Sequence, residues 1–146
     1  MSSPGDQPEF IQKYPIEGGD FVAAGSVSIN VKNLLKGIGF PSPVIRRVAI
    51  VAFEAEMNVV MYGGGGELRL FVSPRRIRLE VADQGPGIAD LDLAMQEGWS
   101  TATPEMRERG FGAGMGLPNM KRNSDRLKIE TGPQRGTTVR AEFDIC

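Results

Sequence analysis

Two glycine-containing segments of the chain have residue types that could bind a phosphorylated ligand. The first follows an alternating apolar and polar run at 77–82, which predicts a half-buried strand, so Asp83 stands where that strand ends. A carboxylate at a strand end can accept hydrogen bonds. The second segment, 109–117, alternates glycine with other residues and then opens a helix with Pro118 in its first turn. Backbone N–H groups left free at such a helix start suit phosphate oxygens.

Each glycine segment alone is also consistent with an ordinary turn. The second segment is not a P-loop, because no Gly-Lys-Ser or Gly-Lys-Thr sequence closes it. It is not a dinucleotide-binding fingerprint either, because no strand-helix-strand pattern precedes it. The order of the segments and the nature of their neighbours must therefore decide whether they form a site.

A polar pair, Glu54 and Asn58, lies on an otherwise apolar helix expected from Ser42 to about Tyr62. The four-residue spacing places the two side chains one turn apart, on a narrow polar edge that they share with Arg47. Burying a carboxylate and an amide without partners costs free energy on the kcal/mol scale, so the pair needs an explanation. Two explanations are open: the pair belongs to a functional site, or Glu54 pairs with Arg47 while Asn58 caps a loop.

The helix that carries this pair is expected to begin with Ser42 as its N-cap and Pro43 at the first helical position. One set of apolar residues forms a stripe along this helix, and other apolar residues cover much of its remaining surface. The helix is therefore expected to be buried nearly all round. Glu56 falls on the other side of the helix from Glu54 and is expected to be a solvated or capping charge.

The rest of the chain predicts an α+β domain. Strands are expected at 9–16, 67–72, 77–82, 127–131 and 137–143, and helices at 26–36, 42–62, 91–97 and 117–124. The runs at 67–72 and 77–82 are joined by a short turn and predict a hairpin. Residues 98–109 have no clear period and are expected to be a loop that opens and closes over a ligand, or an ordinary surface loop. The inventory predicts a two-layer α/β sandwich with an antiparallel or mixed sheet and about three helices on one face.

The composition limits the number of domains, the compartment and the partners. At 146 residues the chain fits one domain, expected over 9–146 after a disordered N-terminus at 1–8. The net charge of −1 gives no electrostatic support for binding nucleic acid or an anionic membrane. Cys146 is the single cysteine and histidine is absent, which excludes an internal disulfide, a Cys-rich metal site and phosphohistidine on this chain. Without a signal segment or a membrane-spanning run, the protein is expected to be soluble and cytoplasmic.

Three motifs follow one another along the chain: Glu54-x-x-x-Asn58 on a helix, Asp83-x-Gly85-x-Gly87 after a strand, and Gly112-x-Gly114-x-Gly116-Leu117 before a helix. This order resembles the N box and the two glycine boxes of the GHKL ATP-binding fold. Gyrase-type ATPases, a family of heat-shock chaperones, the MutL mismatch-repair proteins and histidine kinases share that fold. The final Gly136-Thr137-Thr138-Val139 looks like the strand that closes the adenine pocket in this fold, so the resemblance covers about residues 26–145.

Within this superfamily, the chain is most similar to the small serine kinases of bacterial partner-switching systems, the anti-sigma factors and stressosome switch kinases. The likeness lies in the length, the Glu-Ala-x-x-Asn form of the N box, the Ser/Thr-rich lid and the closing Gly-Thr-Thr. A histidine kinase would need a phosphoacceptor helix with a histidine, and this chain has neither. The lid departs from the kinase pattern, because Thr103 rather than a lysine precedes Pro104.

The resemblance implies a role for each residue of the motifs. Asp83 would accept a hydrogen bond from the adenine amino group, with Thr137 assisting, and Asn58 would bind Mg²⁺ through its side-chain oxygen. Glu54 would act as general base toward a substrate hydroxyl. Arg109 would be directed from the lid at the terminal phosphate. The residues implied to bind ATP and its metal are Asn58, Asp83, Gly85, Gly87, Arg109, Gly112, Gly114, Gly116, Leu117 and Thr137.

The function that the resemblance implies is an ATP- and Mg²⁺-dependent protein serine/threonine kinase. It would phosphorylate a small antagonist protein of the STAS type and so switch which partner is bound. One alternative is a nucleotide-gated module that sequesters a sigma factor or another regulator with little catalysis. The other alternative is a histidine-kinase-like ATPase domain that acts with a separate protein, which would carry the histidine that accepts the phosphate. A homodimer is plausible from the family, with the N-terminal strand and first helix as the region to examine.

Overall fold

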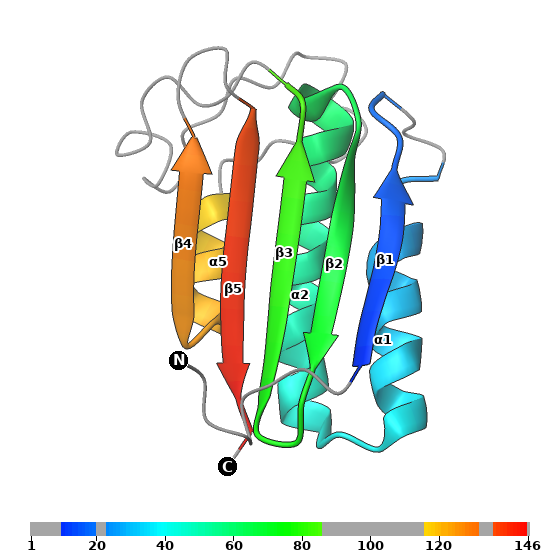
Figure 1. The fold of residues 1–146 in the computed structure, drawn as a ribbon, viewed down its shortest axis with the longest axis vertical. Helices are drawn as coiled ribbons and strands as arrows, with labels where there is room; N and C mark the ends of the chain where they lie inside the picture. Colours follow the sequence, from blue (N-terminus) through cyan, green and yellow to red (C-terminus); the bar gives the residue numbers. More distant parts are fainter. Residues whose placement is uncertain (1–9, 20–22, 86–115, 132–135, 146) are drawn as a thin grey trace.

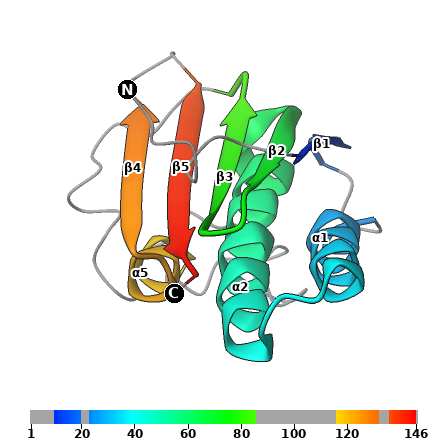
Figure 2. The same ribbon diagram turned by 60° about the horizontal axis from the view of Figure 1, so that its bottom comes forward.

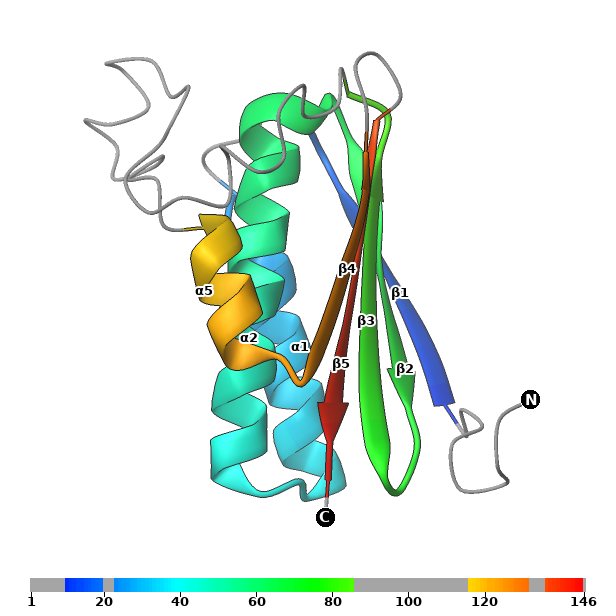
Figure 3. The same cartoon turned by 90° about the vertical axis from the view of Figure 1, so that its left-hand side faces the viewer.

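The computed structural model describes residues 10–19, 23–85, 116–131 and 136–145. Within these ranges, three α-helices cover one face of a five-stranded sheet, which confirms the two-layer α+β sandwich (Figures 1 and 3). The elements are β1 (Phe10–Ile16), α1 (Ser26–Ile38), α2 (Ser42–Asn58), β2 (Gly66–Val72), β3 (Arg76–Asp83), α5 (Gly116–Asn123), β4 (Arg126–Thr131) and β5 (Thr137–Asp144). None of the described helices is long and apolar enough to cross a membrane. The expectations for 1–8, 91–97 and 98–109 fall outside the described residues.

The strands are arranged in the order β1-β2-β3-β5-β4, and every neighbouring pair is antiparallel. The described strands therefore form an antiparallel sheet and not a mixed one. The hairpin of β2 and β3 is confirmed. β1 lies at one edge of the sheet and contains Pro15, which has no N–H to donate and is tolerated at such an edge.

The apolar side chains of the strands point toward the helices. Leu70 lies opposite Leu79, which in turn lies opposite Ala141, and all three are fully buried. Because successive side chains of a strand point to opposite faces, this register gives the sheet one apolar face and one charged face. Figure 2 shows α2 against the middle of the apolar face, with α1 toward β1 and α5 toward β4.

α2 differs from its prediction in three respects. Ser42 is not the N-cap, because the extended Pro41 precedes the helix and no side chain caps it. The last turn, Val59–Gly63, is π-helical. The helix is also not buried all round, because Phe53 exposes 42% of its surface. Among the described elements, the sheet, α1 and α5 pack against α2 on its other sides (Figure 2).

Glu56 is 2% exposed, so the expectation of a solvated charge is wrong. Its carboxylate accepts hydrogen bonds from three backbone N–H groups at the start of α1: those of Gly25 (3.1 Å), Val27 (3.2 Å) and Ser28 (2.9 Å). The first N–H groups of a helix have no partner within the helix and carry partial positive charge, so a carboxylate suits them. Glu56 is therefore a capping charge, and the helix that it caps is α1.

Candidate active site

Glu54 and Asn58 lie in the last turns of α2, and the start of α5 lies against them. A Cβ atom placed on Gly116 would be 3.1 Å from Oε2 of Glu54 and 3.9 Å from Oδ1 of Asn58. The first distance is shorter than ordinary van der Waals contact, so glycine at this position lets the first turn of α5 approach both oxygens. The structure thus brings together the polar pair and the second glycine segment, which are far apart in the sequence.

The Glu54 carboxylate is half-buried and has Asn119 as its partner. Asn119, in α5, donates a hydrogen bond from Nδ2 to Oε1 of Glu54 over 3.4 Å. Burial raises the pKa of Glu54 above its ordinary value, and the hydrogen bond from Asn119 offsets only part of that rise. A carboxylate with a raised pKa holds an accepted proton more firmly, as a general base requires.

Arg47 does not pair with Glu54, so the expected ion pair between these two residues is wrong. Its guanidinium forms an ion pair with Asp125 at 3.1 Å, and its Nε donates to the carbonyl oxygen of Asn123 at 3.1 Å. Asn119 was not among the residues predicted to belong to the site. The available signal was its position three residues after Gly116, which places both residues on one face of the helix.

Asp83 forms the second part of the site, at the end of β3. Its Oδ1 accepts hydrogen bonds from the backbone N–H groups of Gly85 (2.9 Å) and Thr137 (3.1 Å), so the carboxylate links β3 to the start of β5. Burial raises the pKa of Asp83, and the two hydrogen bonds offset part of this rise. Gly136 passes close to Asp83 with a φ of 73°, and a Cβ there would be 2.5 Å from the Asp83 carbonyl oxygen. Both the conformation and the close approach require glycine.

Both parts of the site lie at the same end of the two layers. α2 and β3 end there, and α5 and β5 begin there (Figures 1 and 3). A ligand bound at this end would meet the Asp83 carboxylate on the side of the sheet. It would meet the oxygens of Glu54 and Asn58 on the side of the helices.

The structure describes part of the predicted site. Leu117 is 7% exposed and belongs to the hydrophobic core, where it anchors the start of α5. Contact of any of these residues with ATP stays a prediction. The predicted residues that gather at this end are Glu54, Asn58, Asp83, Gly85, Gly116 and Thr137. Those that fall outside the described residues are Gly87, Arg109, Gly112 and Gly114.

The amide oxygen of Asn58 is a hard oxygen ligand, which suits Mg²⁺. In the described part of the chain, no three His, Cys, Asp or Glu side chains gather into a group that could hold a metal ion. Mg²⁺ keeps several waters and usually takes its other ligands from substrate phosphates. The residues present therefore fit Mg²⁺ bound together with a phosphorylated ligand, and do not form a metal cage made by protein alone.

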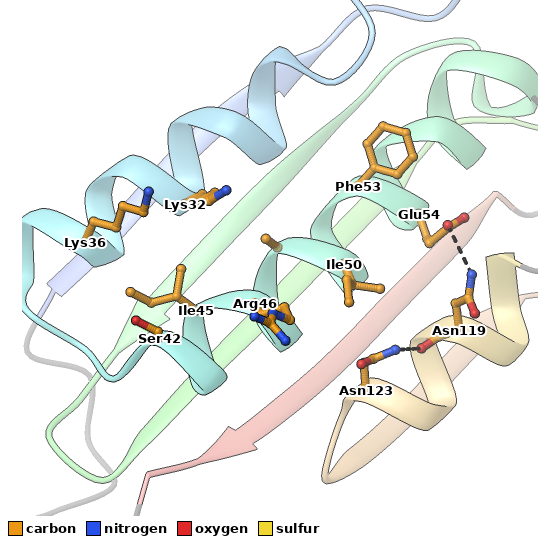
Figure 4. A pocket seen from close by; sticks show the side chains of 11 residues that line it. Lys32, Lys36, Ser42, Ile45, Arg46, Ile50, Phe53, Glu54, Asn119 and Asn123 are labelled. Atoms are coloured by element: carbon orange, nitrogen blue, oxygen red, sulfur yellow. Dashed lines mark hydrogen bonds between the residues drawn. The ribbon is translucent and has the colours of Figure 1, made fainter. Parts of the chain in front are cut away.

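A groove of about 680 Å³ runs along the outer side of α2 and reaches Glu54 and Asn119 (Figure 4). We call it the α2 groove. α1 flanks it on one side and α5 on the other. This groove was not expected from the sequence, because a helix buried nearly all round leaves little surface for one. Basic and apolar side chains line much of it: Lys32, Lys36, Arg46, Ile45, Ile50 and Phe53.

Residues 43–145 match the sequence profile of a family described as histidine kinase-, DNA gyrase B- and HSP90-like ATPases. The chain is 29% identical over 126 residues to the serine/threonine-protein kinase RsbT of Bacillus subtilis (strain 168), with 84% of this chain and 86% of that protein covered. It is 35% identical over 106 residues to an anti-sigma F factor of Thermoanaerobacter sp. (strain X514), with 67% of this chain and 71% of that protein covered.

Two solved structures share the fold. The crystal structure of the RsbU and RsbW domains of a Mycobacterium tuberculosis protein has a TM-score of 0.60 and covers 90% of this chain and 32% of that one. The mycobacterial sensor histidine kinase MprB has a TM-score of 0.53 and covers 91% of this chain and 97% of that one. Each is 16% identical to this chain, so the likeness concerns the fold alone.

Proposed function

The chain belongs to the family of histidine kinase-, DNA gyrase B- and HSP90-like ATPases, and from that premise we propose that it is an ATP- and Mg²⁺-dependent protein serine/threonine kinase. The observation that carries the proposal is the half-buried Glu54 carboxylate, with its raised pKa, against the glycine that opens α5. The similarity to a relative named a serine/threonine-protein kinase supports it.

Glu54 is proposed as the general base. Its carboxylate accepts the proton of a serine or threonine hydroxyl while the hydroxyl oxygen bonds to the terminal phosphorus of ATP. The bond from that phosphorus to the bridging oxygen breaks, and ADP leaves with the electron pair. The burial that raises the pKa of Glu54 supports this role, because the carboxylate then competes better for the hydroxyl proton.

Asp83 and Thr137 are proposed to bind adenine, and Asn58 to bind Mg²⁺. Two backbone N–H groups hold Oδ1 of Asp83, and Oδ2 accepts no hydrogen bond from the described residues. Oδ2 is therefore available to the adenine amino group, whereas the carbonyl of guanine could not donate to it. Mg²⁺ bound with ATP would offset the negative charge of the phosphates.

The proposed acceptor is a small antagonist protein of the STAS type in a bacterial partner-switching system. A sigma factor or another regulator would be the second partner. The names of two relatives support this proposal, since one is a serine/threonine-protein kinase and another an anti-sigma F factor.

The relatives named anti-sigma F factor also favour a second candidate. This is a nucleotide-gated module that sequesters a sigma factor or another regulator with little catalysis. The two candidates differ in whether the partner gains a phosphate or only changes its affinity when nucleotide binds.

The deciding experiment follows the terminal phosphate of ATP. The purified protein is mixed with Mg²⁺, ATP labelled on that phosphate and the proteins encoded beside its gene. Label on a serine or threonine of a partner would establish the kinase. Label that stays on tightly bound ATP would favour the sequestering module, and failure to bind ATP would overturn the proposal.

A further inference from the structure

The α2 groove presents side chains whose chemistry changes from one helical turn to the next. Arg46, Ile50 and Glu54 follow one another at four-residue intervals along α2, and all three line the groove (Figure 4). At ~1.5 Å of rise per residue, successive members are ~6 Å apart along the helix. A ligand lying along α2 therefore meets a cation, then an apolar side chain, and then the proposed base.

The cations of the α2 groove have no acidic partner in the part of the chain that the structure describes. Lys32 and Lys36 on α1 and Arg46 on α2 are exposed, and none of the three forms an ion pair with a described residue. Cations on the sheet differ, since Arg76 and Arg126 each pair with carboxylates of β5. Among the described residues that line the groove, these three cations outnumber the one carboxylate, that of Glu54, and the excess positive charge attracts an acidic ligand.

Apolar side chains also line the α2 groove. Ile45 is buried, Ile50 is half-buried and Phe53 is 42% exposed. An exposed aromatic ring beside aliphatic side chains offers area that an apolar side chain of a ligand can cover. The groove thus fits a ligand that combines acidic and apolar side chains, and not a purely charged one.

We infer that the α2 groove binds a short acidic segment of the acceptor protein and that this segment delivers its serine or threonine hydroxyl to Glu54. The inference rests on the kinase function proposed above. Arg46 and Glu54 are ~12 Å apart along α2, and an extended chain rises ~3.3 Å per residue. The acidic side chain therefore lies about three or four residues from the hydroxyl, with an apolar side chain between them for Ile50.

Two fluorescein-labelled peptides test the charge of the ligand. One contains a serine, a leucine and two glutamates at this spacing, and the other has lysines in place of the glutamates. Binding is measured by fluorescence anisotropy without nucleotide, at low and high salt. The glutamate peptide is expected to bind, more weakly at high salt because ions screen exposed charges, and the lysine peptide is not.

Two charge-reversed double variants test the location. Lys32→Glu/Arg46→Glu reverses two cations of the α2 groove, and Lys13→Glu/Arg75→Glu makes the same change on β1 and in the turn between β2 and β3. The groove variant is expected to bind the glutamate peptide about tenfold more weakly and to gain binding to the lysine peptide. The matched control is expected to behave as the wild type. A gain of lysine-peptide binding also demonstrates that the groove variant is folded.

The inference is overturned if the wild type binds both peptides equally or neither, or if both double variants weaken binding equally. Displacement of the peptide by ATP would assign the groove to the nucleotide and overturn it too. Peptide binding without phosphate transfer to any partner would leave the groove assignment standing and refute the kinase proposal. Transfer to a partner at the wild-type rate by Lys32→Glu/Arg46→Glu would refute the groove assignment alone.

Discussion

Asn119 donates a hydrogen bond to Glu54 across the contact between α5 and α2, so the partner of this carboxylate is neutral. Among the described residues, no lysine or arginine forms an ion pair with Glu54, and Arg47 is held by Asp125 instead. A nearby cation would stabilise the ionised form and make the carboxylate a weaker base. The arrangement therefore keeps the pKa of Glu54 above its ordinary value.

Removal of this donor should change the pH dependence of phosphate transfer. In Asn119→Ala the hydrogen bond that lowers the pKa of Glu54 is lost, so the pKa rises further. Only the ionised carboxylate accepts a proton, so the acid limb of the pH-rate profile should move to higher pH. Asn33→Ala, on an exposed position of α1, is the control. If the acid limb of Asn119→Ala lies at the same pH as that of the wild type, Asn119 does not lower the pKa of Glu54 and the prediction is wrong.

Glu54→Gln should stabilise the protein at neutral pH. The folded-state pKa of Glu54 is raised above its ordinary value of 4.5, so the contribution of Glu54 to stability is lost as the pH rises through that raised pKa. Glutamine does not ionise, so the variant should have the larger free energy of unfolding above this pKa. Denaturant unfolding at neutral pH and below the ordinary pKa checks the prediction. If the free energies of unfolding of Glu54→Gln and the wild type differ by the same amount at both pH values, the prediction is wrong.

Gly116→Ala should slow phosphate transfer by displacing Glu54, the proposed base. The added methyl group would lie 3.1 Å from Oε2 of Glu54, so the carboxylate must move. Misplacement of a catalytic group by ~1 Å can reduce the rate about 100-fold, and a loss of about 10- to 100-fold is expected. Gly37→Ala is the matched control, because no described atom outside the neighbouring helix backbone lies within 4 Å of its Cβ position, and alanine in α1 should stabilise the fold by ~0.5–1 kcal/mol. Equal rates in the two variants would refute the prediction.

Glu56→Gln should destabilise the fold although the substitution is nearly isosteric. The carboxylate accepts hydrogen bonds from three backbone N–H groups of α1, and glutamine replaces one acceptor oxygen with a donor that faces those groups. The expected loss is ~2–3 kcal/mol, measured by denaturant unfolding. Glu67→Gln removes only an exposed ion pair with Arg69 and should cost below ~1 kcal/mol. Similar losses in the two variants would mean that Glu56 is not an important cap.

The strands were predictable because the alternation of apolar and polar residues along each strand indicates which side chains face the core. The run at 77–82 placed Asp83 at a strand end, where β3 in fact ends. The exposure of Phe53 and the burial of Glu56 were not predictable in this way. Helical spacing shows which residues share a side of α2, but only the positions of α1, α5 and the sheet decide which side is covered.

The part of the candidate site that consists of motif residues could be predicted from the sequence, and the rest could not. The resemblance implied that Glu54, Asn58 and Gly116 belong to one site, and the structure places Gly116 close to the other two residues. The partner of Glu54 depends on how α5 packs against α2, and the α2 groove depends on the gap that α1 and α5 leave over that helix. Neither relationship is local in the sequence, so spacing alone could not reveal them.

The role of Glu54 as the base is tested by measuring phosphate transfer in Glu54→Gln. With labelled ATP, Mg²⁺ and the acceptor protein, we expect the variant to bind ATP like the wild type but to transfer phosphate at least ~100-fold more slowly, because the hydroxyl proton has no acceptor. Glu67→Gln, with the same change of charge in β2, should transfer at the wild-type rate. Transfer by Glu54→Gln at the wild-type rate would contradict the assignment of Glu54 as the base.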